Sequence, residues 1–431
     1  MAIHAVDVFT PNTHPVHTYI DREGDNLEGS LKDALSTPNT VISLSGPSKS
    51  GKTVLVERVV GRDCLITISG AELPDAAALW HLVLDWIGAP TATTVQAGTT
   101  NTKQGSVTVG AKGGVPFLAE ASGQGSAGLS AGSSRTEGET FGRSGLTQVE
   151  KEIAGSAFVI FIDDFHYMDR VTQTEVAKQI RAGSGRGIRI CVASVPHRSD
   201  DVVRSNPELR GRTAHIDTAF WAVDELAKIA LRGFDVLNMD IDPPTAKRLA
   251  VEACGSPQLM QQICLQTCFV LSVRVAPETR GKVTLDSRVM GQILEQAAAQ
   301  TDYSSLLRRM HQGAKTRGQE RLQHQFKDGT EGDVYRAVLL ALADGAPRME
   351  FPWASLIERV ENVCDGRSPA GVSVSSACKQ IEGFARSMYP TQRIVEWDDS
   401  AGAETLSIVD PYLLFYLRAS SKLGELGRAV R

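Results

Sequence analysis

Eight residues from Gly46 to Thr53, GPSKSGKT, have the spacing G-x-x-x-x-G-K-[ST] of a phosphate-binding loop. The two glycines let the backbone curl so that its N–H groups converge on an anion. Lys52 would bring a positive charge to the β- and γ-phosphates, and the Thr53 hydroxyl would ligate Mg²⁺. The sequence therefore predicts a site for ATP and Mg²⁺ that is lined by Gly46, Pro47, Ser48, Lys49, Ser50, Gly51, Lys52, Thr53 and Val54.

This loop binds phosphate only if a strand precedes it and a helix follows it. Thr40–Ser45, TVISLS, is a short β-branched and apolar run, which predicts a buried strand. Thr53–Val60, TVLVERVV, predicts the start of a helix whose positive dipole end points at the phosphates. A chance loop of Gly, Ser and Lys is the alternative, and both flanking patterns disfavour it.

A second strand supplies carboxylates. Phe158–Ile162 consists of five apolar residues, which predicts a strand buried on both faces, and Asp163 and Asp164 follow it. Ligands of such sheets bind beyond the carboxyl ends of the strands. We therefore expect Asp163 to hold Mg²⁺, through water or through Thr53, and Asp164 to orient or deprotonate the attacking water. A strand that ends in an ordinary polar turn is the alternative.

Composition narrows the class of protein. The chain has 431 residues, of which 42% are hydrophobic and 22% charged, so it is expected to form two or three globular domains. A net charge of −5 gives no general attraction to nucleic acid or to an acidic membrane. The sequence has no apolar run of membrane-spanning length, no secretory signal and no paired cysteine motif. These features predict a cytoplasmic protein without a membrane partner.

Together, GPSKSGKT and FVIFIDD resemble the AAA+ and STAND branches of the P-loop ATPases. The resemblance implies an α/β fold, with a P-loop NTPase parallel sheet, a helical lid and then a winged-helix domain. Many AAA+ motors have Asp-Glu at the end of the second strand, where this chain has Asp163 and Asp164. The shorter second side chain is typical of STAND signalling ATPases, and it favours a slow switch over a processive motor.

The resemblance also implies groups that act on the terminal phosphate. Ser194 ends a third predicted strand, at the position where a polar residue contacts the γ-phosphate in this family. Arg210 and Arg212 follow where related ATPases reach into the neighbouring subunit's site, which would make hydrolysis depend on assembly. Local pairing of these arginines with Glu208 or Asp217 is an equally weighted alternative.

The base end of the site is implied by two weaker matches. Tyr19, Ile20 and Arg22 match the aromatic, aliphatic and Arg positions of the segment that covers adenine in these ATPases. Gly255–Pro257 resembles the Gly-x-Pro motif of STAND proteins, in which the proline, here Pro257, packs near the adenine. An ordinary helix start with proline in its first turn is the alternative.

The predicted domains follow one another along the chain. They are an ATPase core (1–220) with a Gly/Ser/Thr-rich insertion (91–145), a helical lid (221–300), a basic linker (301–332) and a winged-helix domain (333–431). The insertion is expected to be flexible, or else to form a surface arm with a hairpin at SVTVGAKG. The C-terminal domain has 11 Lys and Arg against 13 Asp and Glu, so it suits protein contacts at least as well as DNA.

These patterns predict a slow or partner-stimulated ATPase that works as a molecular switch. ATP and Mg²⁺ would bind between core and lid, promote assembly of a homo-oligomer and regulate a protein effector, for example in bacterial defence. Two alternatives remain open. One is a DNA-binding ATPase of the replication-initiator or transposition-regulator type, which would use Arg308, Arg309 or Lys379. The other is a scaffold that binds ATP without hydrolysing it.

Overall fold

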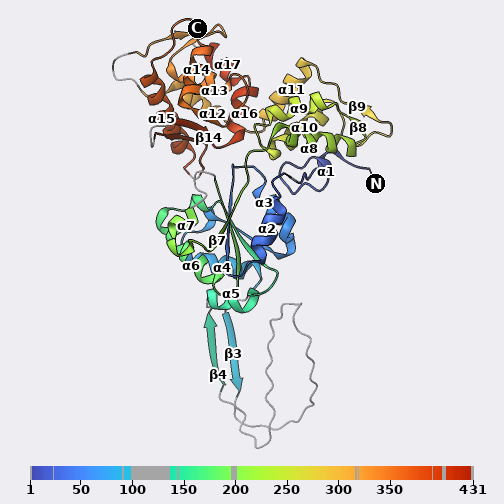
Figure 1. Cartoon of the computed structure of the whole chain (residues 1–431), viewed down its shortest axis with the longest axis vertical. Helices are drawn as coiled ribbons and strands as arrows, with labels where there is room; N and C mark the ends of the chain where they lie inside the picture. Colours follow the sequence, from blue (N-terminus) through green and yellow to red (C-terminus); the bar gives the residue numbers. More distant parts are fainter. Residues whose placement is uncertain are drawn as a thin grey trace, which may run out of the picture.

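The computed structural model describes residues 2–22, 24–89, 92–98, 136–142, 145–195, 201–315, 318, 320–390, 392–399 and 404–428. An α/β core occupies the middle of the molecule, and two helical regions lie side by side beyond one end of its sheet (Figure 1). The predicted fold class is confirmed: a parallel sheet, a helical lid and a small C-terminal domain follow one another along the chain.

Within the described residues, the core is built on a five-stranded parallel sheet with the order β2-β5-β6-β1-β7. Its strands are β1 (Val41–Ser45), β2 (Leu65–Ser69), β5 (Val159–Asp163), β6 (Arg189–Ser194) and β7 (Thr213–Asp217). Because all are parallel, their carboxyl ends meet at one edge, and the ends of β1 and β5 are separated by β6 alone. The strands predicted around the phosphate-binding loop and before the two aspartates are confirmed.

Helices cover both faces of this sheet, which explains the continuous apolar runs of its strands. Val159 and Phe161 of β5 pack on one face, whereas Ile160 and Ile162 pack on the other. The first face is covered by α2 (Leu27–Ser36) and α3 (Lys52–Val60). The second is covered by α4 (Ala76–Trp86), α5 (Leu146–Ile153) and α6 (Arg170–Ser184), and the short α7 (Asp201–Ser205) lies beside α6.

The lid begins shortly after β7. Its elements are α8 (Val223–Val236), β8 (Met239–Asp240), α9 (Pro243–Glu252), α10 (Pro257–Val270), β9 (Gly281–Lys282) and α11 (Ser287–Ala298). The helix predicted to open at the Gly-x-Pro motif is confirmed as α10, because the Ser256 hydroxyl caps it by accepting a hydrogen bond from the Leu259 N–H. The N-terminal helix α1 (Ala5–Val8) packs into the same core as the lid helices.

The C-terminal domain is a winged helix. It contains α12 (Ser304–Gln312), β10 (His324–Gln325), β11 (Glu331–Gly332), α13 (Val334–Ala343), β12 (Glu350–Pro352), α14 (Trp353–Val363), α15 (Gly371–Met388), β13 (Val395–Asp398), β14 (Thr405–Ile408), α16 (Pro411–Ala419) and α17 (Lys422–Arg428). In the part of this domain that the structure describes, β12 joins the β13–β14 hairpin as a third strand, in the order β12-β14-β13. Met388 is the last residue of α15 and is 37% exposed.

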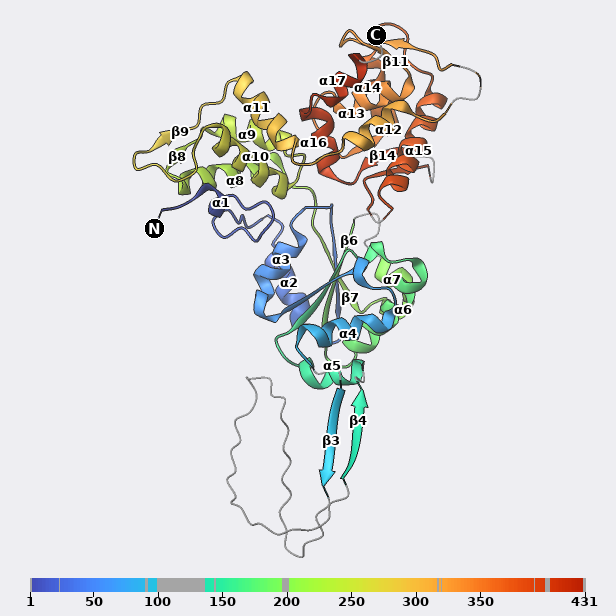
Figure 2. The ribbon, with the colours of Figure 1, turned by 180° about the vertical axis from the view of Figure 1, so that it is seen from behind.

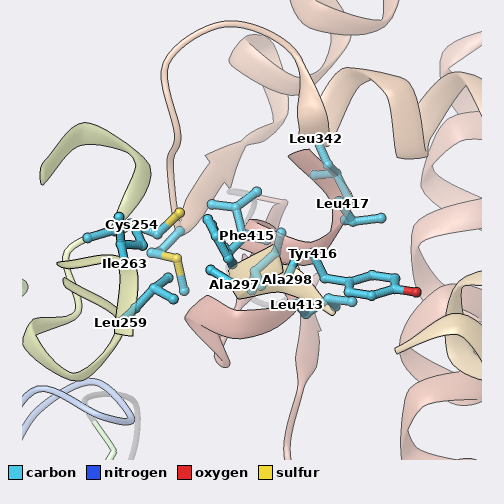
Figure 3. Packing of buried hydrophobic residues seen from close by; sticks show 14 of the residues in the cluster. Cys254, Leu259, Ile263, Ala297, Ala298, Leu342, Leu413, Phe415, Tyr416 and Leu417 are labelled. Carbon is cyan, nitrogen blue, oxygen red and sulfur yellow. The ribbon is translucent and has the colours of Figure 1, made fainter. Parts of the chain in front are cut away.

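The lid and the C-terminal domain share one hydrophobic core, whereas the sheet has separate cores of its own. Figure 3 shows this shared packing, in which Leu413 and Phe415 of α16 lie beside Ala297 and Ala298 of α11, with Leu259 and Ile263 of α10 in the same cluster. Arg418 at the end of α16 also pairs with Glu252 of α9 at 3.1 Å. We call residues 223–428 the lid–wing unit, since this packing joins them into one body.

A two-stranded antiparallel ribbon leaves the core at the end opposite the lid–wing unit (Figures 1 and 2). It consists of β3 (Ala92–Gly98) and β4 (Thr136–Gly142), which pair along their whole length. The hairpin predicted at SVTVGAKG lies outside the described residues. A search of the described helices for one with the length and apolarity of a membrane span finds none.

Candidate nucleotide-binding site

A cavity of about 420 Å³ lies at the carboxyl edge of the sheet, where the core meets the lid–wing unit. Its walls come from the segment between Thr10 and Arg22, the loop Ser48–Leu55, the strand end at Asp163 and Asp164, the start of α10 at Pro257, and the C-terminal domain. This volume lies within the range of pockets that enclose small ligands and cofactors. The cavity is therefore the candidate site for the nucleotide.

The phosphate-binding loop has a backbone that its glycines make possible. Gly51 has φ +93° and Lys49 has φ +63°, both in the left-handed region. A Cβ on Gly46 would come within 1.8 Å of Thr218 Oγ1 and 2.5 Å of the Thr218 carbonyl oxygen. The Thr218 N–H donates to the Ser45 carbonyl at 2.7 Å, so this close approach is part of the sheet edge. Glycine is required at position 46 to seat the loop against β7.

Lys52 is buried, with only 8% of the residue exposed. Its ammonium donates to the carbonyl oxygens of Gly46 at 2.9 Å and Pro47 at 2.8 Å. Burial lowers the pKa of Lys52, and the charges of Asp163 and Asp164 oppose that shift. An arriving phosphate would replace neutral carbonyl acceptors with charged oxygens, and such hydrogen bonds are about twice as strong.

Thr53 and Asp163 lie together, as Mg²⁺ binding requires. The Thr53 hydroxyl donates to Asp163 Oδ2 at 2.7 Å, and the Asp164 N–H donates to Asp163 Oδ1 at 2.9 Å. Among the described residues, no group of three or more His, Cys, Asp or Glu side chains forms a metal cage. One hydroxyl and one carboxylate fit Mg²⁺, which usually takes one or two protein oxygens together with substrate phosphates and water.

Asp164 has an unusual backbone and an unusual acidity. Its φ of +55° lies in the left-handed region, and a Cβ on Gly70 would come within 2.4 Å of the Asp164 carbonyl oxygen. Burial, followed by the charge of Asp163, raises the pKa of Asp164 to about 6, against the opposing effects of Lys52 and Lys49. A carboxylate with a pKa near the working pH is suited to accept a proton from water.

The N-terminal segment and the lid form the end of the cavity where the sequence resemblance predicts the base. Gln261 of α10 is 4% exposed, accepts from the Thr10 N–H at 3.3 Å and donates to Thr18 Oγ1 at 2.6 Å. Tyr19 lines the cavity and its hydroxyl donates to Glu28 at 2.9 Å. The segment is thus fastened to α10, so the lid and the wall near the base form one surface.

Most of the predicted nucleotide contacts lie on the cavity wall. They are Tyr19, Arg22, Ser48, Lys49, Ser50, Gly51, Lys52, Thr53, Val54, Asp163, Asp164 and Pro257. Gly46 and Pro47 lie just behind this wall, where their carbonyls hold Lys52. Arg22 lies on the wall with its guanidinium already bonded to Glu225 at 3.3 Å and to the Ala219 carbonyl at 3.1 Å.

Besides Gly46 and Pro47, three predicted residues do not line the cavity. Ser194 ends β6 beside β1, and its buried hydroxyl has no hydrogen-bond partner among the described residues. Arg210 and Arg212 are exposed, in the segment between α7 and β7. Their predicted role concerns a neighbouring subunit, so it remains a prediction.

The structure also adds residues that the sequence patterns did not single out. Tyr167 lines the cavity three residues after Asp164, and a search for polar groups after the strand would have found it. Trp221 donates from Nε1 to the Ser50 carbonyl at 2.9 Å. Arg393 and Val409 line the cavity from the C-terminal domain, and no local pattern connects them with the phosphate-binding loop.

Comparison with known proteins gives limited similarity in sequence. No protein-family model matches the chain. It is 26% identical over 133 residues to the Holliday junction branch migration complex subunit RuvB of Synechocystis sp., and the aligned part covers 28% of this chain and 37% of RuvB. The chain therefore spans little more than a third of the curated relative that it matches.

Solved structures of similar shape match over most of the chain. One is Cdc6p from Pyrobaculum aerophilum, at 13% identity and a TM-score of 0.43, covering 99% of this chain and all of that one. A Walker-type ATPase of Pyrococcus abyssi has 14% identity and a TM-score of 0.48, with 93% and 96% covered. The ORC2 protein of Aeropyrum pernix has 11% identity and a TM-score of 0.46, with 98% of both chains covered.

The strand order, the phosphate-binding loop after β1 and the aspartates after β5 define a P-loop ATPase fold of the AAA+ type. The resemblance to AAA+ P-loop ATPases that was inferred from the sequence is confirmed at the level of the fold. The narrower assignment to the STAND branch stays a prediction.

Proposed function

We propose that this chain is an ATP-dependent molecular switch, in which the bound nucleotide sets the position of the lid–wing unit and thereby regulates a protein effector. The observation that carries this proposal is that the lid–wing unit and the segment leading into it contact the phosphate-binding loop itself. Ser256 donates to the Lys49 carbonyl at 3.2 Å, and Trp221 donates to the Ser50 carbonyl at 2.9 Å. The Lys49 ammonium lies 5.5 Å from the centre of the Tyr412 ring of α16.

These contacts make the loop sensitive to what it binds. Phosphates would draw Lys49 and Lys52 toward the cavity, and Lys49 would then leave Tyr412. Because α16 shares its core with the lid, a change at Tyr412 would be passed to the whole lid–wing unit. A nucleotide shifts such an equilibrium only by its differential affinity for the two arrangements, and contacts on both bodies provide that difference.

The same site supports slow hydrolysis as the reset step. Thr53 and Asp163 would hold Mg²⁺, which would bridge and neutralise the phosphate oxygens. Lys52 would bind the β- and γ-phosphates, and Ser194 would donate its free hydroxyl near the γ-phosphate. Asp164 would orient the attacking water and accept its proton. The chain would supply hydrolysis alone, and the effector activity would belong to its partner.

Assembly into a homo-oligomer with nucleotide is an expected part of this function. We expect a slowly hydrolysed ATP analogue with Mg²⁺ to convert the protein to one defined oligomer, because Arg212, with Arg210 as the second candidate, would complete a neighbouring site. Mass photometry with and without the analogue measures this directly. Arg212→Ala should still bind ATP but lose most of its turnover, whereas Lys32→Ala, an exposed change on α2, should behave as wild type.

A monomer under both conditions would contradict subunit-shared sites. It would leave a nucleotide-gated monomer whose lid–wing unit responds without assembly, and the arginines would then have no role in turnover. If the analogue binds and the particle mass stays constant, the assembly part of the proposal is wrong.

A DNA-handling ATPase is the second candidate, and the similarity to a subunit of a Holliday junction complex favours it. The positive side chains first considered for DNA are partly engaged within the chain. Arg309 donates to the Gly313 carbonyl at 2.8 Å and lies 4.0 Å from the centre of the Phe384 ring, and Lys379 pairs with Asp399 at 3.1 Å. Salt-dependent DNA binding that requires ATP would favour this candidate over the effector switch.

A further inference from the structure

Arg393 lies on the wall of the nucleotide cavity although it belongs to the C-terminal domain. It immediately precedes Ile394 and the strand β13, so it moves with the lid–wing unit. We propose that Arg393 contacts the terminal phosphate of ATP bound within the same chain. This inference rests on the proposed function, since it requires that the cavity binds ATP. It identifies a side chain that would contact the γ-phosphate and so distinguish ATP from ADP.

The position of Arg393 relative to the strand ends supports a contact at the phosphate end. The Val409 N–H donates to the Ile394 carbonyl at 2.9 Å, so Arg393 lies beside the segment Val409–Asp410. Tyr412 follows this segment, and the centre of its ring lies 5.5 Å from the Lys49 ammonium of the phosphate-binding loop. Asp163 and Asp164 line the same cavity as Arg393 and Val409. These contacts place the Arg393 segment on the side of the cavity that holds the phosphate-binding loop and the end of β5.

The opposite end of the cavity is already closed by other groups. The segment from Thr10 to Tyr19 and residue Gln261 form the wall near the base, as described above. A nucleotide that lies with its phosphates over Gly51 and Lys52 would point its terminal phosphate toward Asp163 and Asp164. That is the side from which Arg393 approaches.

The present partner of Arg393 is one that a phosphate can replace. Its Nη1 donates to Glu396 Oε1 at 2.7 Å, and the two side chains are 35% and 17% exposed. A partly exposed ion pair of this kind contributes little to stability. A phosphate offers the planar guanidinium two parallel charged hydrogen bonds, which is the stronger arrangement.

The other cations of the cavity wall are held in different ways. Arg22 is 8% exposed and is already bonded to Asp25, Glu225 and the Ala219 carbonyl. Lys52 and Lys49 belong to the phosphate-binding loop, where Lys52 donates to two loop carbonyls and the Lys49 ammonium lies 5.5 Å from the centre of the Tyr412 ring. Arg393 is thus the cation of the described wall that is both carried by the C-terminal domain and held by a single exchangeable carboxylate.

This placement would let the chain distinguish ATP from ADP without a second subunit. ADP lacks the phosphate that Arg393 would reach, so ADP would leave Arg393 on Glu396. ATP would draw Arg393 from Glu396 toward the terminal phosphate, and the β13–β14 hairpin would move with it. This hairpin packs on α16, which in turn packs against the lid (Figure 3). The presence of the third phosphate would thereby determine the position of the lid–wing unit.

The test measures the affinities of a slowly hydrolysed ATP analogue and of ADP, both with Mg²⁺, for wild type, Arg393→Ala, Arg393→Lys and Glu396→Gln. We expect Arg393→Ala to lower the affinity for the ATP analogue by about tenfold or more and the affinity for ADP by less than about twofold. Arg393→Lys should recover part of the loss, because charge is kept and the bidentate geometry is not. Arg386→Ala is the matched control, since it removes an exposed arginine of α15 that pairs with Glu382.

Glu396→Gln separates a direct contact from a structural role. If Arg393 reads the phosphate, freeing it from Glu396 leaves the analogue's affinity unchanged or improves it. If Arg393 only holds the hairpin through the ion pair, Glu396→Gln reproduces the loss seen with Arg393→Ala, and the inference is overturned. An unchanged ratio of ATP-analogue to ADP affinity in Arg393→Ala overturns it as well. Wild type that binds neither nucleotide instead overturns the proposed function.

Discussion

Lys52→Ala is expected to weaken the binding of Mg²⁺-ATP by about 100-fold or more, the upper end of what one buried charged hydrogen-bond donor contributes. Lys52 is the buried ammonium in the loop, and its two carbonyl partners mark the place where phosphate oxygens would lie. Isothermal titration calorimetry with ATP and Mg²⁺ measures the loss. The protein itself should remain folded, because burial lowers the pKa of Lys52, which shows that the folded state bears a desolvation cost for this charge that alanine removes.

Two further variants control for this result. Lys178→Ala removes an exposed lysine of α6 that pairs with Glu175, and it should leave binding unchanged. Lys52→Arg keeps the charge but cannot reproduce the compact ammonium, so it should also bind poorly. If Lys52→Ala binds ATP as tightly as wild type does, the cavity is not the nucleotide site.

Asp164→Asn is expected to lower the rate of ATP hydrolysis by about 10²- to 10⁴-fold while leaving ATP binding intact, which is the range for loss of a general base. Asparagine keeps the shape of the side chain and removes the group that accepts the proton. Asp163→Asn should instead weaken the dependence of binding on Mg²⁺, because Asp163 is the carboxylate paired with Thr53. Single-turnover measurements of phosphate release separate the two effects.

The acidity of Asp164 gives a second signature of the same role. Its pKa is raised to about 6, so the carboxyl is protonated below that pH and cannot accept a proton from water. In wild type, kcat/KM should therefore fall as the pH decreases through about 6, and it should be independent of this group at higher pH. Equal turnover in Asp164→Asn and wild type would show that another group is the base. Wild type that binds ATP without turnover would favour the scaffold alternative.

The conformation of the segment Gly46–Thr53 could be predicted because its motif is contiguous in the sequence. Gly46–Thr53 carries its own geometry, and the strands beside it are apolar at every position because helices cover both faces. The neighbouring carboxylates followed from the rule that parallel strands end at one edge, and the 2.7 Å bond between Thr53 and Asp163 agrees with that rule.

The contribution of the C-terminal domain could not be predicted, for a physical reason. Arg393 and Tyr412 approach the loop only because α16 packs on the lid, and each apolar segment in that core is consistent with an ordinary helix face. The strand β12 was missed because Glu350–Pro352 is too short to alternate and contains a proline. Long-range packing of this kind leaves no periodic signal in the sequence.

The central claim is that bound nucleotide moves the lid–wing unit relative to the core. The most direct test is the distance between the core and the C-terminal domain, measured by double electron–electron resonance. Spin labels at Lys178→Cys of α6 and Val372→Cys of α15 occupy exposed sites, at 57% and 85% exposure, and Cys64→Ser removes the one cysteine of the described residues that is not buried. We predict that a slowly hydrolysed ATP analogue with Mg²⁺ shifts the distance distribution in wild type and leaves it unchanged in Lys52→Ala. Superimposable distributions with and without saturating analogue, in protein shown to bind it, would contradict the switch.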